Sequence, residues 1–392
     1  MKNHILCIMG FLFARTVAAQ NNVDSIVRQV ERNNMSLQSN KKYWEAKRNE
    51  FKTGLTPYDP KVEYDYLFGS PAGAGNQKDF SVTQRLDFPT AYRLKKQLSG
   101  HQIAQTNLQQ QVFRQDVLLE AKLQSLHVIY LNKKSAELNR RLFNTQSLVA
   151  DYEKKLEKGD VIILDVNKAR LQLLTIQHEV KLNENERQVI LTKISGLNGG
   201  IPIIIIDTVY PEAPFIPEFE ILDSTIEAND PLIEVYDQEM KILQQQISLQ
   251  KAMNLPKIET GYHSQGILGQ SYKGFHAGIT IPLWENKNKL NAAKSNLEYT
   301  VSITQTHRLE HRLENMQYFE QLDVRLKMIQ EYRELLSTLN NTALLNKALE
   351  LGQITIIQYF YDESFYFTAY DKYLQAEWEY QQAVARLYKF QL

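Results

Sequence analysis

Cysteine is nearly absent from this chain, which has only Cys7 among its 392 residues. A disulfide framework is therefore excluded, as is a cysteine nucleophile anywhere beyond that position. Glycine-rich phosphate loops are missing too, since neither a Walker pattern nor GxGxxG occurs. A zinc protease motif needs Glu directly after its first histidine, but Arg308 follows His307 in the pair His307 and His311. We predict no enzyme activity, no catalytic residues, no cofactor and no metal site.

An excess of positive charge and a long apolar run are also missing. The formal net charge is +0, which gives no support for nucleic-acid binding, because such binding needs a basic face. No run of 18 apolar residues follows the N-terminal segment, which excludes a transmembrane helix. Met1–Ala19 has the pattern of a secretory signal peptide, with a charged Lys2, a short apolar core over Ile5–Ala14, and small residues before a cut ahead of Gln20.

Proline and glycine are scarce in two long stretches of the chain. Only Gly100 interrupts Thr90–Lys158, and neither residue type interrupts Leu283–Leu351. A helix of roughly 67 residues, rising 1.5 Å per residue, is about 100 Å long. Apolar residues recur three and four positions apart in both stretches, which predicts one buried stripe on each helix. Helices of this length indicate a coiled coil, a tube or a fibre.

The turn residues around these stretches are duplicated. Gly159 lies 70 positions after Pro89, and Gly352 lies 70 positions after Pro282. We infer a tandem repeat of about 190 residues, well above the period of solenoid repeats. The predicted parts are a signal peptide (1–19), a first repeat (20–200), a linker (201–224) and a second repeat (225–392). The first repeat is expected to contain a helix over Val23–Lys52, a β-hairpin over 61–88, a long helix over 90–158 and a return helix over 163–197. The second repeat is expected to contain a helix over Thr225–Ala252, a β-hairpin over 257–282, a long helix over 283–351 and a return helix over 355–392.

The linker carries two further expectations. Its five isoleucines between Ile201 and Val209 predict a short buried strand. Asp223 or Ser224 is expected to cap the helix that follows.

Both predicted hairpins alternate apolar and polar residues. This alternation is typical of strands with lipid on one side and water on the other. The residues that we expect to face lipid are Val62, Tyr64, Tyr66, Phe80, Val82, Leu86, Ile258, Tyr262, Phe275, Ile279 and Ile281. Four strands do not close a barrel, and an open sheet edge is not stable in lipid. Three copies would supply twelve strands, enough for a water-filled lumen, so we predict a homotrimer whose helices continue the barrel as a tunnel.

The two segments at the ends of the long helices resemble the tips of the TolC-type outer membrane efflux proteins. The first segment is Gly159-Asp160-Val161-Ile162-Ile163-Leu164-Asp165-Val166-Asn167-Lys168-Ala169-Arg170, and the second is Leu351-Gly352-Gln353-Ile354-Thr355-Ile356-Ile357-Gln358. The resemblance implies a mainly α-helical trimer with a barrel in the outer membrane and a helical tunnel through the periplasm of a Gram-negative bacterium. It also implies a periplasmic adaptor protein and an inner-membrane pump of the RND or ABC type as partners. The tip residues expected to gate the tunnel or contact the adaptor are Gly159, Asp160, Asp165, Gly352, Gln353, Gln358, Tyr359 and Tyr361.

Some tip features of the family are missing here. The resemblance implies that an acidic residue at Asp165 pairs with an arginine and a tyrosine on the second tip. Ile354 and Leu349 stand at those positions in this chain, and the acidic ring expected near Gln358 and Tyr361 is absent. Packing of the aromatic run Tyr359-Phe360-Tyr361 is our alternative hypothesis for how the tip closes.

Three functions fit these patterns. The first is a passive exit duct for small molecules or ions, and the second is the outer membrane channel of type I protein secretion, which has the same architecture. The third is a periplasmic coiled-coil adaptor or structural protein, which does not require the duplicated hairpins. The exported compound is not encoded in these patterns.

Overall fold

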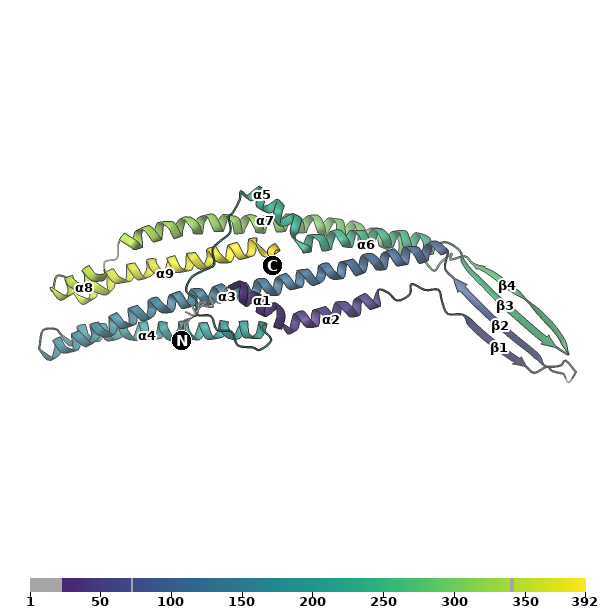
Figure 1. Ribbon diagram of the computed structural model, residues 1–392, viewed down its shortest axis with the longest axis horizontal. Helices are drawn as coiled ribbons and strands as arrows, with labels where there is room; N and C mark the ends of the chain where they lie inside the picture. The colour runs from purple at the N-terminus through teal and green to yellow at the C-terminus, as the bar shows by residue number, and fades with distance from the viewer. Residues whose placement is uncertain (1–22, 72, 339–341) are drawn as a thin grey trace, which may run out of the picture. The chain divides into compact units, whose positions relative to one another are not determined.

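The computed structural model describes residues 23–71, 73–338 and 342–392, so the predicted signal peptide lies outside the described residues. The chain is mainly α-helical, with two β-hairpins (Figure 1). The elements in chain order are α1 (Val23–Asn33), α2 (Met35–Glu50), β1 (Lys61–Leu67), β2 (Gln77–Leu86), α3 (Pro89–Glu157), α4 (Ile163–Leu197), α5 (Phe219–Asn229), α6 (Pro231–Met253), β3 (Lys257–Ile267), β4 (Gln270–Thr280), α7 (Lys289–Thr338), α8 (Thr342–Glu350), α9 (Ile356–Leu387) and the 3-10 turn η1 (Lys389–Gln391).

The first long helix is α3, which runs for 69 residues. Because its apolar residues recur with helical periodicity, large side chains such as Leu118, Leu126 and Leu138 are almost fully buried. The predicted mainly helical fold with two hairpins is confirmed.

The second long helix was predicted from residue 283, and this start is wrong. The chain makes a turn after β4, and α7 begins only at Lys289. Asn288 has a positive φ of 66°, a conformation outside the right-handed helix. The Asn286 side chain donates to the Met253 carbonyl at 2.7 Å and holds the turn against the end of α6. Helix α8 is described separately from α7, and residues 339–341 between them are outside the described part of the chain.

The two shorter predicted helices are each divided in two, contrary to expectation. Asn34 separates α1 from α2, and Asp230 separates α5 from α6. Both residues have extended backbone, and both accept a hydrogen bond from the start of the next helix, Asn34 from the Leu37 amide and Asp230 from the Leu232 amide. They are N-caps, and Pro231 at the first position of α6 strengthens the second break. Helix α5 also begins at Phe219, so Asp223 and Ser224 lie inside it rather than at its cap.

The strand predicted over Ile201–Val209 does not form a ladder in the described part of the chain. The segment belongs to no helix or strand, and its burial alternates, with Ile203 and Ile205 buried and Ile204 exposed. The Asn132 side chain donates at 3.0 Å to the carbonyls of both Ile205 and Asp207. A side chain of α3 therefore satisfies backbone groups that a neighbouring strand would otherwise pair.

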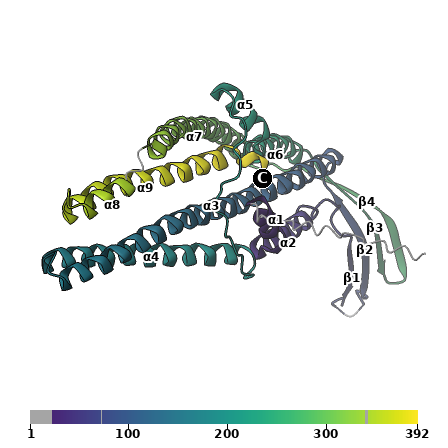
Figure 2. The same ribbon diagram turned by 60° about the vertical axis from the view of Figure 1, so that its left-hand side comes forward.

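The four strands form one antiparallel sheet in chain order, β1-β2-β3-β4 (Figure 2). β2 pairs with β3 over ten residue pairs, from Gln77↔Ile267 to Leu86↔Ile258. This pairing joins the two hairpins, which come from different halves of the sequence.

The chain forms two compact units, and each combines segments of both predicted repeats. The tandem repeat along the chain stays a prediction. Unit 1 contains α1, the second half of α3, α4, the linker up to Ala213, the end of α7, α8 and most of α9. Unit 2 contains α2, the sheet, the first half of α3, the rest of the linker, α5, α6, most of α7 and the end of α9. Within unit 1, Asn183 of α4 and Arg141 of α3 make the contacts that join α3 to α4 and to α9. Within unit 2, Arg48 of α2 and Gln238 of α6 hydrogen-bond to α3.

Candidate functional sites

One face of the sheet carries rows of apolar side chains that run across three or four strands. Directly paired residues of an antiparallel sheet lie on the same face, so the register defines each row. The two most apolar rows are Val62–Val82–Tyr262–Phe275 and Leu86–Ile258–Ile279. Phe275 is 94% exposed and Ile279 is 73% exposed. In the described chain these side chains have little covering them, which is unusual for such a large apolar surface.

The other predicted lipid-facing residues lie on or beside this same face. Tyr64 pairs with Phe80, and Tyr66 follows in the next row toward the hairpin turns. Ile281 is exposed and lies just beyond the end of β4. The rows nearest the turns are more polar than predicted, because Lys78 and Lys273 belong to them. The apolar band is thus confined to the part of the sheet nearer the helices.

The opposite face of the sheet is polar. Lys61 pairs with Glu63 at 2.5 Å, and His276 lies 3.3 Å from Glu259. The sheet therefore has one apolar face and one polar face. In the described residues β1 pairs with β2 alone and β4 with β3 alone, so both outer strands leave a row of backbone groups unpaired.

The two predicted tips have the same backbone geometry. At the first, Gly159 donates to the Leu156 carbonyl and Asp160 donates to the Lys155 carbonyl. At the second, Gly352 donates to Leu349 and Gln353 donates to Ala348. This pair of bonds is the Schellman motif, which requires a left-handed residue after the helix, and the glycines have φ values of 80° and 69°.

The helix after the second tip starts with a capping box that the sequence analysis missed. The Thr355 amide donates to Gln358 Oε1 at 3.0 Å, and the Gln358 amide donates to Thr355 Oγ1 at 3.3 Å. The sequence Thr-x-x-Gln before an apolar run is the signal that indicates it. Gln358, predicted as a gate or docking residue, has a local structural role in α9. The first tip differs, since Ile162 precedes α4 without a side-chain cap.

An apolar cluster joins both tips within unit 1. It contains Val149, Tyr152, Val166, Ala169, Leu349, Ile356 and Tyr359 as buried members. Tyr359 is 3% exposed, and its hydroxyl donates to Asn346 Oδ1 at 2.8 Å. Tyr361 is 63% exposed and meets only Phe365 edge to edge, at 4.8 Å between ring centroids, among the described rings. Of the two predicted gate tyrosines, one belongs to the core of a single chain and the other lies on its surface.

Asp165 has a local partner instead of one on the second tip. Its carboxylate lies 3.2 Å from Lys168 Nζ, one turn further along α4. Leu349 is buried in the tip cluster and Ile354 packs against it. The positions where the resemblance implies an arginine and a tyrosine are thus occupied by apolar residues that hold the two tips together.

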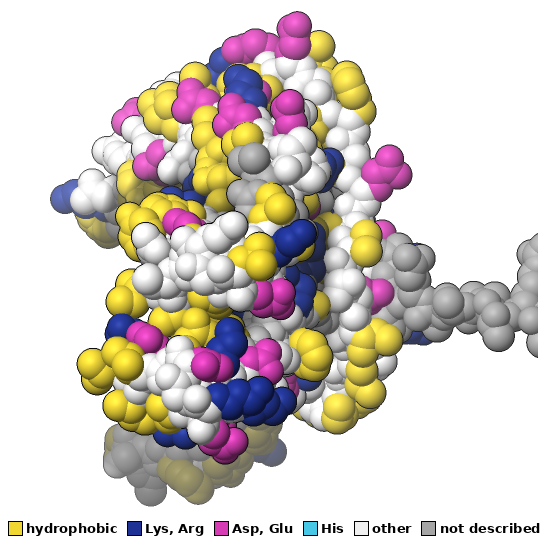
Figure 3. Space-filling view, turned by 90° about the vertical axis from the view of Figure 1, so that its left-hand side faces the viewer, with side chains coloured by type: hydrophobic (Ala, Val, Ile, Leu, Met, Phe, Trp, Pro, Cys, Tyr) yellow, Lys and Arg dark blue, Asp and Glu magenta, His cyan; other side chains and the backbone are white. Residues whose placement is uncertain are grey.

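Charges of both signs lie among apolar side chains on the end of the molecule that carries the tips (Figure 3). A groove of about 470 Å³ between α3 and α8 is lined by Lys154, Lys155 and Lys158 together with Asp151 and Glu350. This mixture gives the tip surface hydrogen-bonding groups and no single strong charge.

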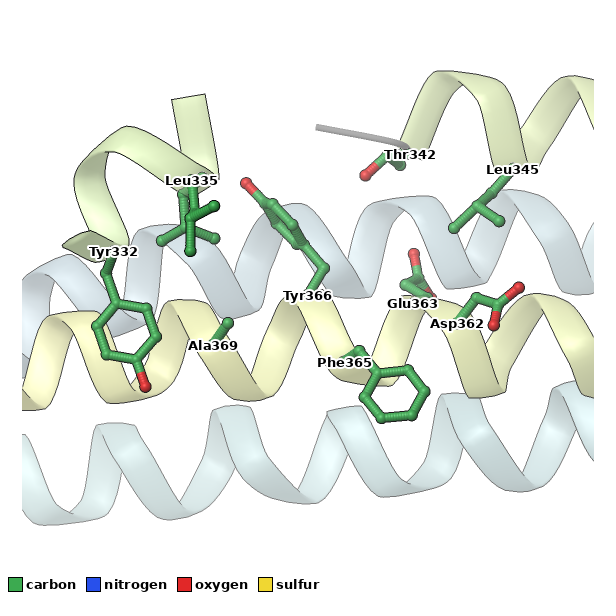
Figure 4. A pocket seen from close by; sticks show the side chains of 10 residues that line it. Tyr332, Leu335, Thr342, Leu345, Asp362, Glu363, Phe365, Tyr366 and Ala369 are labelled. Carbon is green, nitrogen blue, oxygen red and sulfur yellow. The ribbon is translucent and has the colours of Figure 1, made fainter. Parts of the chain in front are cut away.

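A second groove, of about 410 Å³, lies beside α9 (Figure 4). Tyr366 points from α9 to the space between Leu335 and Thr342, whereas Phe365 leaves the helix on another side. Asp362 and Glu363 complete the wall. The pKa of the Glu363 carboxyl is raised overall. Burial raises it by more than the Tyr359 hydroxyl and the guanidinium groups of Arg140 and Arg141 lower it.

The sequence analysis also missed a buried ionic network between α3 and α9. Arg141 is 3% exposed, and it contacts Glu137 at 2.9 Å and Asp371 at 2.8 Å. Its guanidinium group also lies over the ring of Phe367, 4.1 Å from the centroid. Burial disfavours the charge, but the hydrogen bonds that Arg141 donates to the carboxylates of Asp371 and Glu137 outweigh it and raise the pKa of Arg141. Periodicity does not reveal such a network, because a charged residue on a long helix normally faces water.

None of the helices in the described part of the chain is long and apolar enough to cross a membrane. No group of three or more His, Cys, Asp or Glu side chains in the described residues is arranged to hold a metal ion.

No family model and no curated protein matches this sequence. Several solved structures do match its fold. CusC, whose structures concern folding and transmembrane channel formation, is 15% identical, with a TM-score of 0.80 over 95% of this chain and 92% of CusC. The CmeC outer membrane channel of Campylobacter jejuni is 13% identical, with a TM-score of 0.74 over 94% of this chain and 85% of CmeC. The outer membrane protein VceC of Vibrio cholerae is 11% identical, with a TM-score of 0.70 over 94% of each chain.

Proposed function

This chain has the fold of the TolC-type outer membrane efflux channels, and from that premise we propose that it forms a passive exit duct across the outer membrane. The observation that carries the proposal is the sheet, with an exposed apolar face, a polar face and two unpaired edges. An apolar sheet face of this kind is stable when it contacts lipid. The unpaired edges are stable in lipid only when other strands complete their hydrogen bonds. A second copy of the chain supplies such strands.

Exposed apolar side chains on the outer helices support assembly from several copies. Within α2, which is described in full, no residue is buried. In the same unit, α7 exposes Leu309 and Leu313. In unit 1, α4 exposes Leu171 and Leu182. When one surface of a chain binds a different surface of the next copy, successive copies form a closed ring if the rotation between them closes.

A trimer is the assembly that we propose. Three chains of four strands give a barrel of twelve, wide enough for a hydrated lumen, whereas two chains give a barrel filled by its own side chains. The long helices would then continue the lumen into the periplasm. We propose that export uses energy from an inner-membrane pump, reached through a periplasmic adaptor that binds the tips. The proposed cargo is a small molecule or an ion.

The decisive experiment combines membrane fractionation with cysteine cross-linking. The only native cysteine lies in the predicted signal peptide, so cysteines introduced in pairs along β1 and β4 are the only thiols of the processed chain. We expect outer membrane localisation, and cross-linked species that end at three chains. A chain that stays monomeric in the periplasmic fraction, or a ladder that continues beyond three, contradicts the duct.

The closed state of the tip is tested by conductance in planar lipid bilayers. The Tyr359→Ala change removes a buried member of the cluster that joins both tips, and we expect it to raise the conductance of the resting channel. Tyr361→Ala is the matched control for loss of a neighbouring exposed aromatic ring. If neither change alters the resting conductance, the aromatic packing hypothesis is wrong.

A further inference from the structure

Helix α7 is fastened to the joint between α5 and α6 by a row of polar residues. Arg308, His311, Arg312 and Asn315 are spaced so that they share one side of α7. Arg308 contacts Asp237 at 3.1 Å and also pairs with Glu227. Arg312 contacts Glu220 at 2.7 Å and Asp223 at 2.9 Å. These contacts all lie within unit 2.

The centre of this row is an ion pair at the joint itself. His311 Nε2 lies 2.9 Å from Asp230 Oδ2, and the two side chains are only 19% and 12% exposed. The other oxygen of the same carboxylate, Asp230 Oδ1, accepts from the Leu232 amide at 2.8 Å. One carboxylate therefore caps α6 and binds α7 at the same time.

Most of the surrounding groups favour the charged form of this pair, although the Asn315 amide nitrogen lies 3.3 Å from His311 Nδ1. The hydrogen bond that His311 donates to Asp230 raises the pKa of His311 above its ordinary 6.5, against the effect of burial, and the charges of Asp230, Glu314 and Asp223 add to it. Burial acts to raise the pKa of Asp230, but the hydrogen bonds from His311 and the Leu232 amide, with the charges of His311 and Lys389, lower it overall.

Charged and titratable side chains from several elements surround this pair. Helix α7 supplies His307, Glu310, Glu314, Arg308 and Arg312. The pKa of His307 is lowered by burial and by the charge of His311. Helix α5 supplies Asp223, α6 supplies Asp230 and Asp237, and η1 supplies Lys389. The arginines stay charged at every physiological pH, so the two histidines are the groups in this set that change charge near neutrality, and of the two only His311 has a raised pKa.

The first half of the chain provides an internal comparison. Asn34 lies 196 residues before Asp230, the same offset that relates Pro60-Lys61 to Pro256-Lys257, and it caps α2 as Asp230 caps α6. Leu118 lies 193 residues before His311, the offset that relates Pro89 to Pro282. The α1–α2 joint therefore has a neutral cap, and an apolar residue stands where the histidine does.

We propose that the α5–α6 joint is a proton-dependent clasp, closed by protonated His311 on Asp230 and loosened when His311 loses its proton. The sign follows from the raised pKa in the folded state. The extra stability is fully present below about 6.5, the ordinary histidine value, and it is lost as the pH rises through the folded value. The arginine pairs remain, so α5 loosens without leaving α7. The clasp does not depend on the proposed duct.

Hydrogen exchange of the full-length protein in detergent, at about pH 5.5 and about pH 8.5 with correction for intrinsic rates, tests the clasp. In the wild type we expect protection of α5 and of the first turn of α6 to fall several-fold at the higher pH, with little change in α1 and α2. Asp230→Asn keeps a side-chain oxygen for the cap and removes the charge, so the pH dependence should vanish. His311→Gln should also remove it, whereas His307→Gln should retain it.

A direct titration covers variants that fold poorly. The His311 ring, followed by NMR in the wild type, should titrate above a free histidine, and Asp230→Asn should bring it down. The clasp is rejected if Asp230→Asn and the wild type show the same pH dependence, if α1–α2 loosens equally, or if His311 titrates at or below the free value.

Discussion

The Tyr359 hydroxyl lies 2.8 Å from Asn346 Oδ1 and 3.2 Å from Glu363 Oε1, and so ties α9 to α8 across the second tip. The tyrosine ring is part of the apolar cluster that also contains Val149 and Val166 from the first tip. The position of one buried side chain thus connects both helical hairpins of unit 1.

Tyr359→Phe should lower the free energy of unfolding by about 1–1.5 kcal/mol, because it keeps the ring and removes a buried hydrogen bond. Thermal and denaturant unfolding in detergent measure the change. Tyr361→Phe is the control, since the Tyr361 side chain is exposed, and its effect should stay within about 0.5 kcal/mol. Equal effects of the two changes would mean that the hydroxyl of Tyr359 contributes nothing specific.

Gly352→Ala and Gly159→Ala should each destabilise the chain by about 1 kcal/mol, because their positive φ values strain any side chain. An added Cβ meets no described atom within 4 Å at either position, so the cost is conformational rather than steric. Gly100→Ala is the opposite control. It lies inside α3 with open space around it among the described atoms, and alanine there should stabilise by about 0.5–1 kcal/mol. Melting temperatures that shift in the same direction for all three would contradict the left-handed turns.

Arg141→Met should destabilise unit 1 by about 3 kcal/mol, since it leaves Glu137 and Asp371 without the buried charge that they contact. Arg140→Met removes the neighbouring arginine, which also binds Glu137 but is 39% exposed. Its cost should stay below about 1 kcal/mol. Denaturant unfolding of the two variants measures the difference. A larger loss for the exposed arginine would show that burial does not decide the strength of this network.

Ile279→Lys should reduce the amount of protein in the outer membrane fraction, because a lysine on a lipid-facing position costs about 2–4 kcal/mol near the bilayer centre. Thr280→Lys places the same charge one residue along β4, on the polar face, and should insert normally. Fractionation and heat-modified gel mobility report insertion. If both variants insert equally well, the apolar face does not contact lipid.

The sequence predicted the features that depend on repeated or strongly marked local signals. The long helix α3, the turns at Gly159 and Gly352, and the strand faces follow from missing breakers, paired glycines and period-two alternation. The failures occurred where one side chain decides the backbone. Asn34 and Asp230 divide helices that periodicity joins, and Asn132 replaces the strand partner expected for the isoleucine segment.

The site residues were harder to predict than the fold. Exposure of Phe275 follows from alternation, but the burial of Tyr359 next to the exposed Tyr361 depends on which turn of α9 meets α8. The Thr355–Gln358 capping box was readable from its spacing. The contact of Arg141 with Asp371 joins residues 230 positions apart, and a single sequence gives no signal for such a pair.

The pairing of β2 with β3 has a consequence for how the protein folds. Val82 and Tyr262 are direct partners in the sheet, although a long helical hairpin and the linker separate them in sequence. Each hairpin can close from neighbouring residues, but their junction waits until most of the chain has been synthesised, and contacts of such high sequence separation form slowly. During that interval β2 presents a bare edge, which is prone to aggregation. A holding chaperone that masks this strand should therefore raise the yield of assembled protein more than one that acts on the finished helices.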